Sequence, residues 1–314
     1  MDIKPKYETV TIRVPGTSAN LGAGFDTLGL ALNIWNKVTL RWGGPPNVKI
    51  HGEGAEALEA DDKNLMYKAA ISLLEEYGIK SAELNIEAWQ EIPLARGLGS
   101  SSAAIVAGIF GANALLGFPA DMPKLLRLAV AMEGHPDNVA PALIGGMTIA
   151  LTEGHDAFAA PISVPEEFQF VVFIPDMNLS TKTARAVLAP TVSRQDAVFN
   201  ISRASLLVAS LATNRPEYLR LATQDRLHQE ARQEVFPAMK QIFKNAMAAG
   251  AKGVFLSGAG SCVIAITTRA ENRAQTIGYE MADAADKSRV TGTFRVLDIA
   301  SKGAQTIALG LERP

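Results

Sequence analysis

The chain has 314 residues, of which 48% are hydrophobic and 20% are charged, so it can bury a sizeable core and has the length of about two domains. Thirty Lys and Arg residues against 32 Asp and Glu residues give a formal net charge of −2, which argues against nucleic-acid and anionic-membrane partners. The single cysteine, Cys262, excludes a disulfide framework and suits a reducing compartment. The first residues lack the apolar segment of a signal peptide, and the longest apolar stretch, 103–118, is short for a membrane span. We therefore expect a cytoplasmic protein.

The first half of the sequence predicts strands mixed with helices. Strands are expected where β-branched and aromatic residues stand between turn signals, at 9–14, 30–42, 48–50, 84–88 and 145–150. Helices are expected where apolar residues recur at helical spacing, at 61–77, 101–116 and 122–132. The second of these helices is apolar on all sides, which is typical of a buried helix.

The second half repeats this mixture without a strict strand–helix alternation. The predicted strands cover 168–174, 253–257, 261–267, 293–299 and 304–309, and the predicted helices cover 194–213, 237–249 and 272–286. Pro161 and Pro165 are expected to break regular structure between the halves. The sequence therefore predicts the α+β class, with one domain over 1–160 and a second over 161–314.

One segment has the composition of a phosphate-binding loop. It reads P-L-A-R-G-L-G-S-S-S-A and covers 93–103. Its two glycines allow close approach of the backbone, and three serines follow where the buried helix must begin, so that free N–H groups and hydroxyls would surround an anion. The alternative is a glycine turn followed by a serine N-cap. The loop is not a Walker A motif, since Gly-Lys is absent from the chain, and no dinucleotide fingerprint or G-x-S-x-G motif occurs either.

Two further glycine-rich segments flank this loop in the sequence. Residues 15–26 read P-G-T-S-A-N-L-G-A-G-F-D, and residues 256–262 read L-S-G-A-G-S-C. In this order and spacing, the three segments resemble the three motifs of the GHMP small-molecule kinases, and the match extends along nearly the whole chain. Four short segments are similar to those of the homoserine kinases in that superfamily: V-P-G-T-S-A-N-L-G-A-G-F-D, H-P-D-N-V-A-P at 135–141, S-T-K-T-A-R at 180–185 and H-Q-E-A-R at 228–232.

The resemblance implies a two-domain fold in which the N-terminal domain, which binds ATP, is like the ribosomal S5 domain 2 and the C-terminal domain is ferredoxin-like. It also implies ATP and Mg²⁺ as cofactors. The residues expected to bind ATP are those of the loop and of the third glycine motif, namely Pro93, Leu94, Ala95, Arg96, Gly97, Leu98, Gly99, Ser100, Ser101, Ser102, Ala103, Gly258 and Gly260. Ser101 and Glu133 are the expected magnesium ligands, although Glu133 could also be a solvated carboxylate at a helix end.

The same resemblance assigns the substrate site. Arg185 and Arg232 would bind the carboxylate of L-homoserine, Asp26 its ammonium group, and Asn20 and Asn138 its hydroxyl. Each has a structural alternative: a solvated charge for an arginine, and a turn residue for Asp26 or Asn20.

Two weaker candidates complete the expected substrate site. His135 would line it unless it is a buried histidine of the core, and Thr181 would do so unless it caps a helix. Because Asn138 stands where related kinases have an aspartate base, we expect in-line attack by an oriented hydroxyl with little help from a base. Asp137 is the one nearby carboxylate that could act as a base instead.

The resulting expectation is a homoserine kinase that forms O-phospho-L-homoserine for threonine biosynthesis. A GHMP kinase for a different small hydroxy acid or alcohol is the first alternative, and a catalytically silent nucleotide-binding regulator is the second. A homodimer is possible by analogy with fold relatives.

Overall fold

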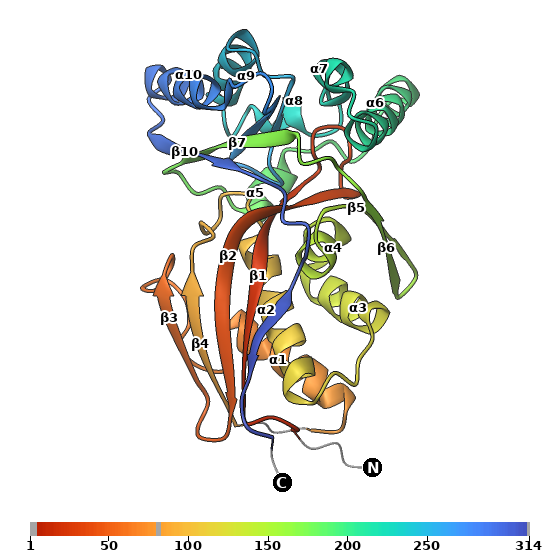
Figure 1. Ribbon diagram of the computed structural model, residues 1–314. Coiled ribbons are helices and arrows are strands. Elements are labelled where there is room, and N and C mark those ends of the chain that lie inside the picture. Colours follow the sequence, from red (N-terminus) through yellow and green to blue (C-terminus); the bar gives the residue numbers. More distant parts are fainter. Residues whose placement is uncertain (1–4, 80–82, 313–314) are drawn as a thin grey trace.

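The computed structural model describes residues 5–79 and 83–312, which form two sheets with associated helices (Figure 1). The first sheet has the order β11-β1-β2-β4-β3, and a hairpin of β5 and β6 joins it at β2. Its strands are β1 (Thr9–Ala19), β2 (Leu28–Trp42), β3 (Asn47–Gly52), β4 (Leu84–Gln90), β5 (Met147–Glu153), β6 (Asp156–Ile162) and β11 (Gln305–Leu309). All of its pairings are antiparallel except that of β3 with β4.

The second sheet is antiparallel throughout and has the order β10-β7-β9-β8. Its strands are β7 (Phe168–Pro175), β8 (Gly253–Leu256), β9 (Val263–Thr268) and β10 (Gly292–Leu297). The helices α9 (Met239–Ala248) and α10 (Ala274–Lys287) pack together and cover it at the top of Figure 1. The remaining helices of this half are α5 (Thr181–Ala186), α6 (Arg194–Ala212), α7 (Leu219–Ala222) and α8 (Gln229–Arg232), with a 3₁₀ turn at Pro216–Tyr218.

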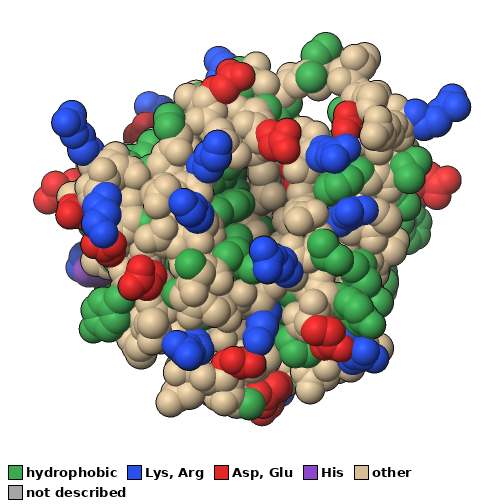
Figure 2. All heavy atoms as spheres, turned by 90° about the horizontal axis from the view of Figure 1, so that it is seen from above, with side chains coloured by type: hydrophobic (Ala, Val, Ile, Leu, Met, Phe, Trp, Pro, Cys, Tyr) green, Lys and Arg blue, Asp and Glu red, His purple; other side chains and the backbone are tan. Residues whose placement is uncertain are grey.

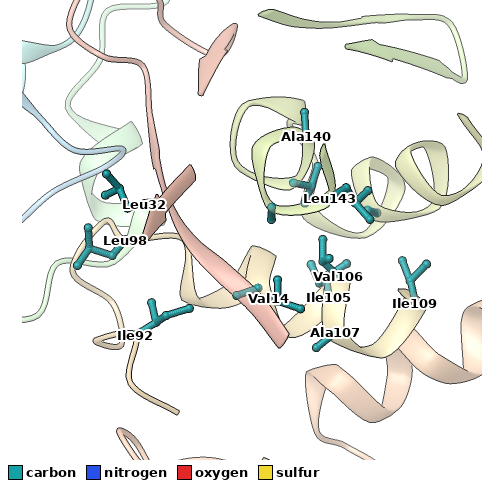
Figure 3. Packing of buried hydrophobic residues seen from close by; sticks show 14 of the residues in the cluster. Val14, Leu32, Ile92, Leu98, Ile105, Val106, Ala107, Ile109, Ala140 and Leu143 are labelled. Atoms are coloured by element: carbon teal, nitrogen blue, oxygen red, sulfur yellow. The ribbon is translucent and has the colours of Figure 1, made fainter. Parts of the chain in front are cut away.

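Four helices lie against the first sheet, namely α1 (Leu65–Glu76), α2 (Ser100–Leu115), α3 (Met122–Glu133) and α4 (Pro136–Ile144). Helix α2 is buried on all sides because it contacts β1 and β2 on one side and the other three helices around it. Figure 3 shows Ile105 and Val106 of α2 between Val14 of β1 and the α4 residues Ala140 and Leu143. Burial of each such aliphatic side chain stabilises the fold by roughly 1.5–3 kcal/mol, so the N-terminus of α2 has a rigid support.

The α+β class and most of the expected elements are confirmed, and the differences have local causes. Helix α1 begins four residues later than expected, at Leu65, because Asn64 caps it by accepting a hydrogen bond from the Met66 N–H. Helix α4 was not expected, since it is short and contains two prolines. Pro136 stands in its first turn, where no N–H is needed.

Two strand assignments need correction. Residues 156–162 form β6, although Pro161 was expected to break regular structure there. Among the described residues β6 pairs only with β5, and a proline is tolerated in an edge strand. Strand β11 was assigned to the C-terminal unit but pairs with β1, so the end of the chain returns to the first sheet. The division into domains at residue 160 stays a proposal, in which β11 is counted with the N-terminal sheet. Within the described ranges, no helix is both long and apolar enough to cross a membrane.

Candidate active site

A pocket of about 570 Å³ is lined by residues from both halves of the chain. It brings together the three glycine-rich segments and the short segments around 135, 181 and 232. The expected site residues that line it are Asn20, Asp26, Leu94, Ala95, Gly97, Gly99, Ser100, Ser101, Glu133, His135, Asp137, Asn138, Thr181, Arg185, Arg232, Gly258 and Gly260. Residues more than 200 positions apart in the sequence therefore meet at one site, as the resemblance implied.

The loop that precedes α2 needs its glycines. Gly97 and Gly99 have φ values of +80° and +68°. A Cβ atom on Gly97 would lie 2.2 Å from the carbonyl oxygen of Ser257, and one on Gly99 would lie 1.9 Å from Oγ1 of Thr17. Both positions thus combine a left-handed backbone with a close approach that only glycine allows.

The helix that follows is not capped by a serine. Its N-cap is Gly99, which makes no side-chain cap hydrogen bond. The serine hydroxyls bond elsewhere: Oγ of Ser101 lies 2.7 and 2.8 Å from the two carboxylate oxygens of Glu133, and Oγ of Ser102 lies 2.7 Å from one of them. The alternative of a simple serine N-cap is therefore wrong, and the first-turn residues Ser100 and Ser101 line the pocket, where the N–H groups of a helix N-terminus need partners.

Some loop residues support the site without lining the pocket. The five are Pro93, Arg96, Leu98, Ser102 and Ala103. Leu98, Ser102 and Ala103 are buried in the protein interior. Nη2 of Arg96 donates to the carbonyl oxygen of Asp176, 3.3 Å away, across the boundary between the two halves. We therefore expect these five residues to shape the loop, not to touch a ligand directly.

Asp26 and Arg185, which both line the pocket, form a bidentate ion pair. Their N–O distances are 2.6 Å (Nη2 to Oδ1) and 3.0 Å (Nη1 to Oδ2). The hydrogen bond to Asp26 raises the pKa of Arg185 above its ordinary value, against the opposing effect of burial. The acid and the base expected to bind the two charged groups of one substrate are thus adjacent, and in this structure they bind each other.

Arg232 is only 1% exposed, and within the described ranges it has no comparable ion-pair partner. Its Nη1 donates to the carbonyl oxygen of Gly258 (2.7 Å) and to Nδ1 of His228 (3.0 Å), and its Nε donates to the carbonyl oxygen of Ala184 (3.3 Å). Burial, followed by the charge of Arg185, lowers the pKa of Arg232 to about 10. In the part of the chain that the structure describes, no carboxylate pairs with this guanidinium, so the pocket contains a buried positive charge in need of an anion.

The two asparagines of the site are fixed by other residues. Asn20 accepts from the Asp26 N–H (2.9 Å) and donates to the carbonyl oxygen of Gly258 (3.0 Å), so it joins two of the glycine-rich segments. Oδ1 of Asn138 accepts from the buried Thr17 hydroxyl, 2.8 Å away. Thr17 was not singled out in the sequence, and its place in the motif P-G-T-S-A-N was the only available signal.

The remaining candidates are placed as follows. Thr181 lines the pocket, and the cap of α5 is its neighbour Ser180, so the N-cap alternative for Thr181 is wrong. Nδ1 of His135 lies 2.6 Å from Oδ1 of Asp137, which is 1% exposed. Burial alone would lower the pKa of His135, but the hydrogen bond and charge of Asp137, with the charge of Glu133, outweigh burial and raise it above 6.5.

Sequence reasoning missed several other residues that line or support the pocket. Phe25 contacts both arginines, whose guanidinium carbons lie 5.4 and 5.6 Å from its ring centre. Several residues of the segment before α1 and of its first turn also line the pocket, namely Leu58, Glu59, Lys63, Asn64, Leu65 and Met66. No local spacing assigned these residues to the site, because only the fold brings them to the pocket.

Comparisons with known proteins agree with this geometry. The sequence matches the family model for the GHMP kinases N terminal domain over residues 64–146 and that for GHMP kinases C terminal over residues 207–284. The L. major mevalonate kinase, solved in complex with R-mevalonate, has the same fold, with a TM-score of 0.70 at 14% identity over 96% of this chain and 99% of that one. The chain belongs to the GHMP kinase family.

Two relatives at 40% identity and one solved structure at 30% identity are homoserine kinases. The homoserine kinase of Moorella thermoacetica is 40% identical over 296 residues, which cover 94% of this chain and 99% of that protein. That of Microchaete diplosiphon is 40% identical over 304 residues, which cover 96% and 98%. The crystal structure of homoserine kinase from Cytophaga hutchinsonii gives a TM-score of 0.86 at 30% identity, with 96% and 98% of the two chains covered. The chain thus falls in the homoserine kinase branch of the family.

Proposed function

We infer that the protein is a homoserine kinase, which transfers the γ-phosphate of ATP to the hydroxyl of L-homoserine and so forms O-phospho-L-homoserine for threonine biosynthesis. The observation that carries this inference is the buried guanidinium of Arg232, which pairs with no carboxylate among the described residues and lies near the Asp26–Arg185 pair. A zwitterionic amino acid matches these charges. Its carboxylate would neutralise the two arginines, and its ammonium group would bind Asp26.

The glycine loop at 93–103 and the start of α2 fit a nucleotide phosphate. The free N–H groups at the start of α2 and the positive end of its dipole favour an anion, and Gly97 and Gly99 allow the backbone to approach it closely. We propose that the expected ATP-binding residues act here, with the five that do not line the pocket holding the loop in shape. The third glycine segment, with Gly258 and Gly260, would border the same space.

Ser101 and Glu133 fit a magnesium ion. A hydroxyl and a carboxylate already lie within 2.8 Å of each other at the start of α2, and hard oxygen ligands of this kind suit Mg²⁺, which keeps several waters and phosphate oxygens in its shell. Among the described residues no cluster of three or more His, Cys, Asp or Glu could hold a metal, so protein ligands alone would bind the ion weakly. When bound with the nucleotide, it would neutralise charge on the transferred phosphate.

The residues around the substrate hydroxyl can orient it but offer little basicity. The side-chain oxygen of Asn138 accepts from Thr17, which leaves the amide nitrogen as the group that can face the pocket, and an amide takes up no proton. Asp137 is buried and bonded to His135. We therefore propose in-line attack by an oriented hydroxyl, through a loose phosphoryl-transfer transition state that needs little base assistance.

A coupled assay of ADP release with homoserine, mevalonate and galactose tests the assignment. We expect turnover of homoserine to exceed that of the other two alcohols by at least about a thousandfold in kcat/KM, since neither offers both charges to the site. Preference for another alcohol would indicate a different GHMP kinase. Binding of ATP without turnover of any alcohol would indicate the silent regulator.

Three further expectations stay proposals. They are a cytoplasmic location, a possible homodimer, and the absence of nucleic-acid and membrane partners. The surface in Figure 2 supports the last of these, because basic and acidic side chains are interspersed over the face seen from above and neither sign forms a continuous patch.

A further inference from the structure

His228 is a buried histidine beside the substrate end of the pocket. It is 1% exposed and does not line the pocket itself. Its Nε2 lies 2.8 Å from the carbonyl oxygen of Gly22, and its Nδ1 lies 3.0 Å from Nη1 of Arg232. Each ring nitrogen thus has one partner, and each partner can act in only one way.

These partners determine the tautomer. An arginine side chain can only donate, so Nδ1 must carry a lone pair, and a carbonyl oxygen can only accept, so Nε2 must carry the hydrogen. A protonated ring could not accept from Arg232. The neutral Nε2–H form is therefore the one form of His228 that satisfies both neighbours.

Burial of the ring favours the same neutral form, although the charges around it act in both directions. Burial lowers the pKa of His228 to about 4; the charge of Asp225 opposes this and that of Arg232 adds to it. Asp26 also acts to raise it. The carboxylate of Asp225 is occupied by the N–H groups of residues 227–229 and by the Asn200 side chain, with its nearer oxygen 3.7 Å from Nε2.

The ring also holds Phe25 in place. The two ring centres are 5.2 Å apart with an interplanar angle of 30°, and the guanidinium carbons of Arg185 and Arg232 lie 5.4 and 5.6 Å from the centre of the Phe25 ring. His228 thus contacts Arg232 by a hydrogen bond and Phe25, which lies against both arginines, by packing. With Nη1 and Nε of Arg232 bonded to the protein, Nη2 is the nitrogen left for a ligand.

We propose that His228 is a positioning residue which, as its neutral Nε2–H tautomer, orients the guanidinium of Arg232 toward the carboxylate of the amino-acid substrate. The proposal rests on the proposed function, because it assigns the ligand of Arg232. It adds to that function a residue that acts on substrate affinity and specificity without touching substrate, nucleotide or metal.

Two substitutions of similar size separate the functions of the two ring nitrogens. His228→Asn places a side-chain oxygen near the position of Nδ1, where it can accept from Arg232. His228→Gln places its amide near Nε2, where it can donate to Gly22 but leaves Arg232 without its acceptor. A merely structural role would make the two variants comparable, or would favour Gln, which fills more of the space.

We expect His228→Gln to raise the KM for homoserine about tenfold or more, with kcat within about threefold and the KM for ATP within about twofold of wild type. His228→Asn should recover most of the homoserine KM. Equal KM values for the two variants, or a loss confined to kcat, would overturn the proposal. If the wild-type enzyme fails to phosphorylate homoserine at all, the proposed function fails instead.

A measurement on the wild-type enzyme covers the case in which neither variant folds. Nitrogen-15 NMR of labelled histidine distinguishes the tautomers, and the His228 signals can be identified by elimination with single substitutions of His51, His135 and His155. We expect one histidine to remain in the neutral Nε2–H form from pH 8 to pH 6. An Nδ1–H form, or protonation of this ring within that range, would contradict the proposal, because Nδ1 could then not accept from Arg232.

Discussion

Replacement of Arg232 by methionine separates the contribution of this residue to catalysis from its contribution to stability. Burial lowers the pKa of Arg232 to about 10, well below its ordinary value, so keeping the guanidinium charged in the folded protein costs on the order of 3 kcal/mol. The cost is present in full at pH 7, below the pKa values of both the folded and the unfolded states, and is relieved only as the pH rises through about 10. Arg232→Met removes this cost while keeping most of the buried volume.

The substitution also leaves some acceptors without donors. Nδ1 of His228 loses its partner, which costs about 1–3 kcal/mol. The carbonyl oxygen of Gly258 keeps the hydrogen bond from Asn20, and the bond to Ala184 is long at 3.3 Å. We therefore expect the free energy of unfolding to stay nearly the same or to rise, with the Tm unchanged or a few degrees higher.

Activity should fall in contrast. A hydrogen bond to a charged group contributes about 1.5–3 kcal/mol, so loss of the Arg232 contact to the substrate carboxylate should lower kcat/KM for homoserine about 10- to 150-fold. The KM for ATP should be unchanged. The control substrate is 3-amino-1-propanol, which is homoserine without its carboxylate. It should be a poor substrate of the wild type, and its kcat/KM should be nearly unchanged by the substitution.

Differential scanning calorimetry and the coupled assay measure the two effects. An equal loss of activity toward homoserine and 3-amino-1-propanol would show that Arg232 supports the structure or the phosphate. A Tm lowered by many degrees would show that its bonds to the carbonyls hold the fold together. Either result would refute the view that this buried charge is kept for the substrate. Arg185→Met should give a similar loss of homoserine activity, and the double variant should lose less than the sum of the single losses, since both arginines act on one carboxylate.

Three other predictions concern the phosphate loop and the histidine–aspartate pair. Ser101→Ala should lower kcat at least about tenfold with little change in Tm. Gly99→Ala should also weaken ATP binding, because its Cβ would lie 1.9 Å from Oγ1 of Thr17. Wild-type kinetics in both variants would contradict the loop assignment. Asp137→Asn should keep more than about a tenth of kcat, and a loss of about a thousandfold with ATP binding intact would identify Asp137 as a base. By NMR, His135 should titrate above pH 6.5 in the wild type and at lower pH in Asp137→Asn. The contribution of protonated His135 to stability is present in full below pH 6.5 and is lost as the pH rises through the raised pKa. Unfolding measured as a function of pH checks this.

The sequence predicted the elements whose signals are local. Helix α2 was expected from its continuous apolar composition, and the loop before it from two glycines and three serines in a row. Helix α4 was missed because its two prolines act against a helical prediction, although Pro136 in the first turn is favourable. Strand β11 was placed in the wrong sheet because its partner, β1, lies nearly 300 residues earlier in the chain, and no local pattern reports such a pairing.

The site shows the same division. Motif resemblance placed Ser101, Glu133, Asp26 and Arg185 in one pocket, and the structure brings them there. The burial of Arg232 could not be foreseen, since an arginine at the end of a short helix is ordinarily solvated. The positions of Phe25, Thr17 and His228 depend on contacts between segments about 120 to 200 residues apart, such as that of Thr17 with Asn138.

Competition among three alcohols tests the central claim most directly. Wild-type enzyme is given ATP, Mg²⁺ and equimolar L-homoserine, 3-amino-1-propanol and 4-hydroxybutyrate. The second alcohol lacks the carboxylate of homoserine, and the third lacks its ammonium group. The phosphorylated products are distinguished and quantified by ³¹P NMR. If the two arginines and Asp26 recognise a zwitterion, O-phospho-L-homoserine should account for nearly all of the product. A comparable amount of either other phosphate ester would show that the site does not bind the charged group which that alcohol lacks, and would contradict the assignment.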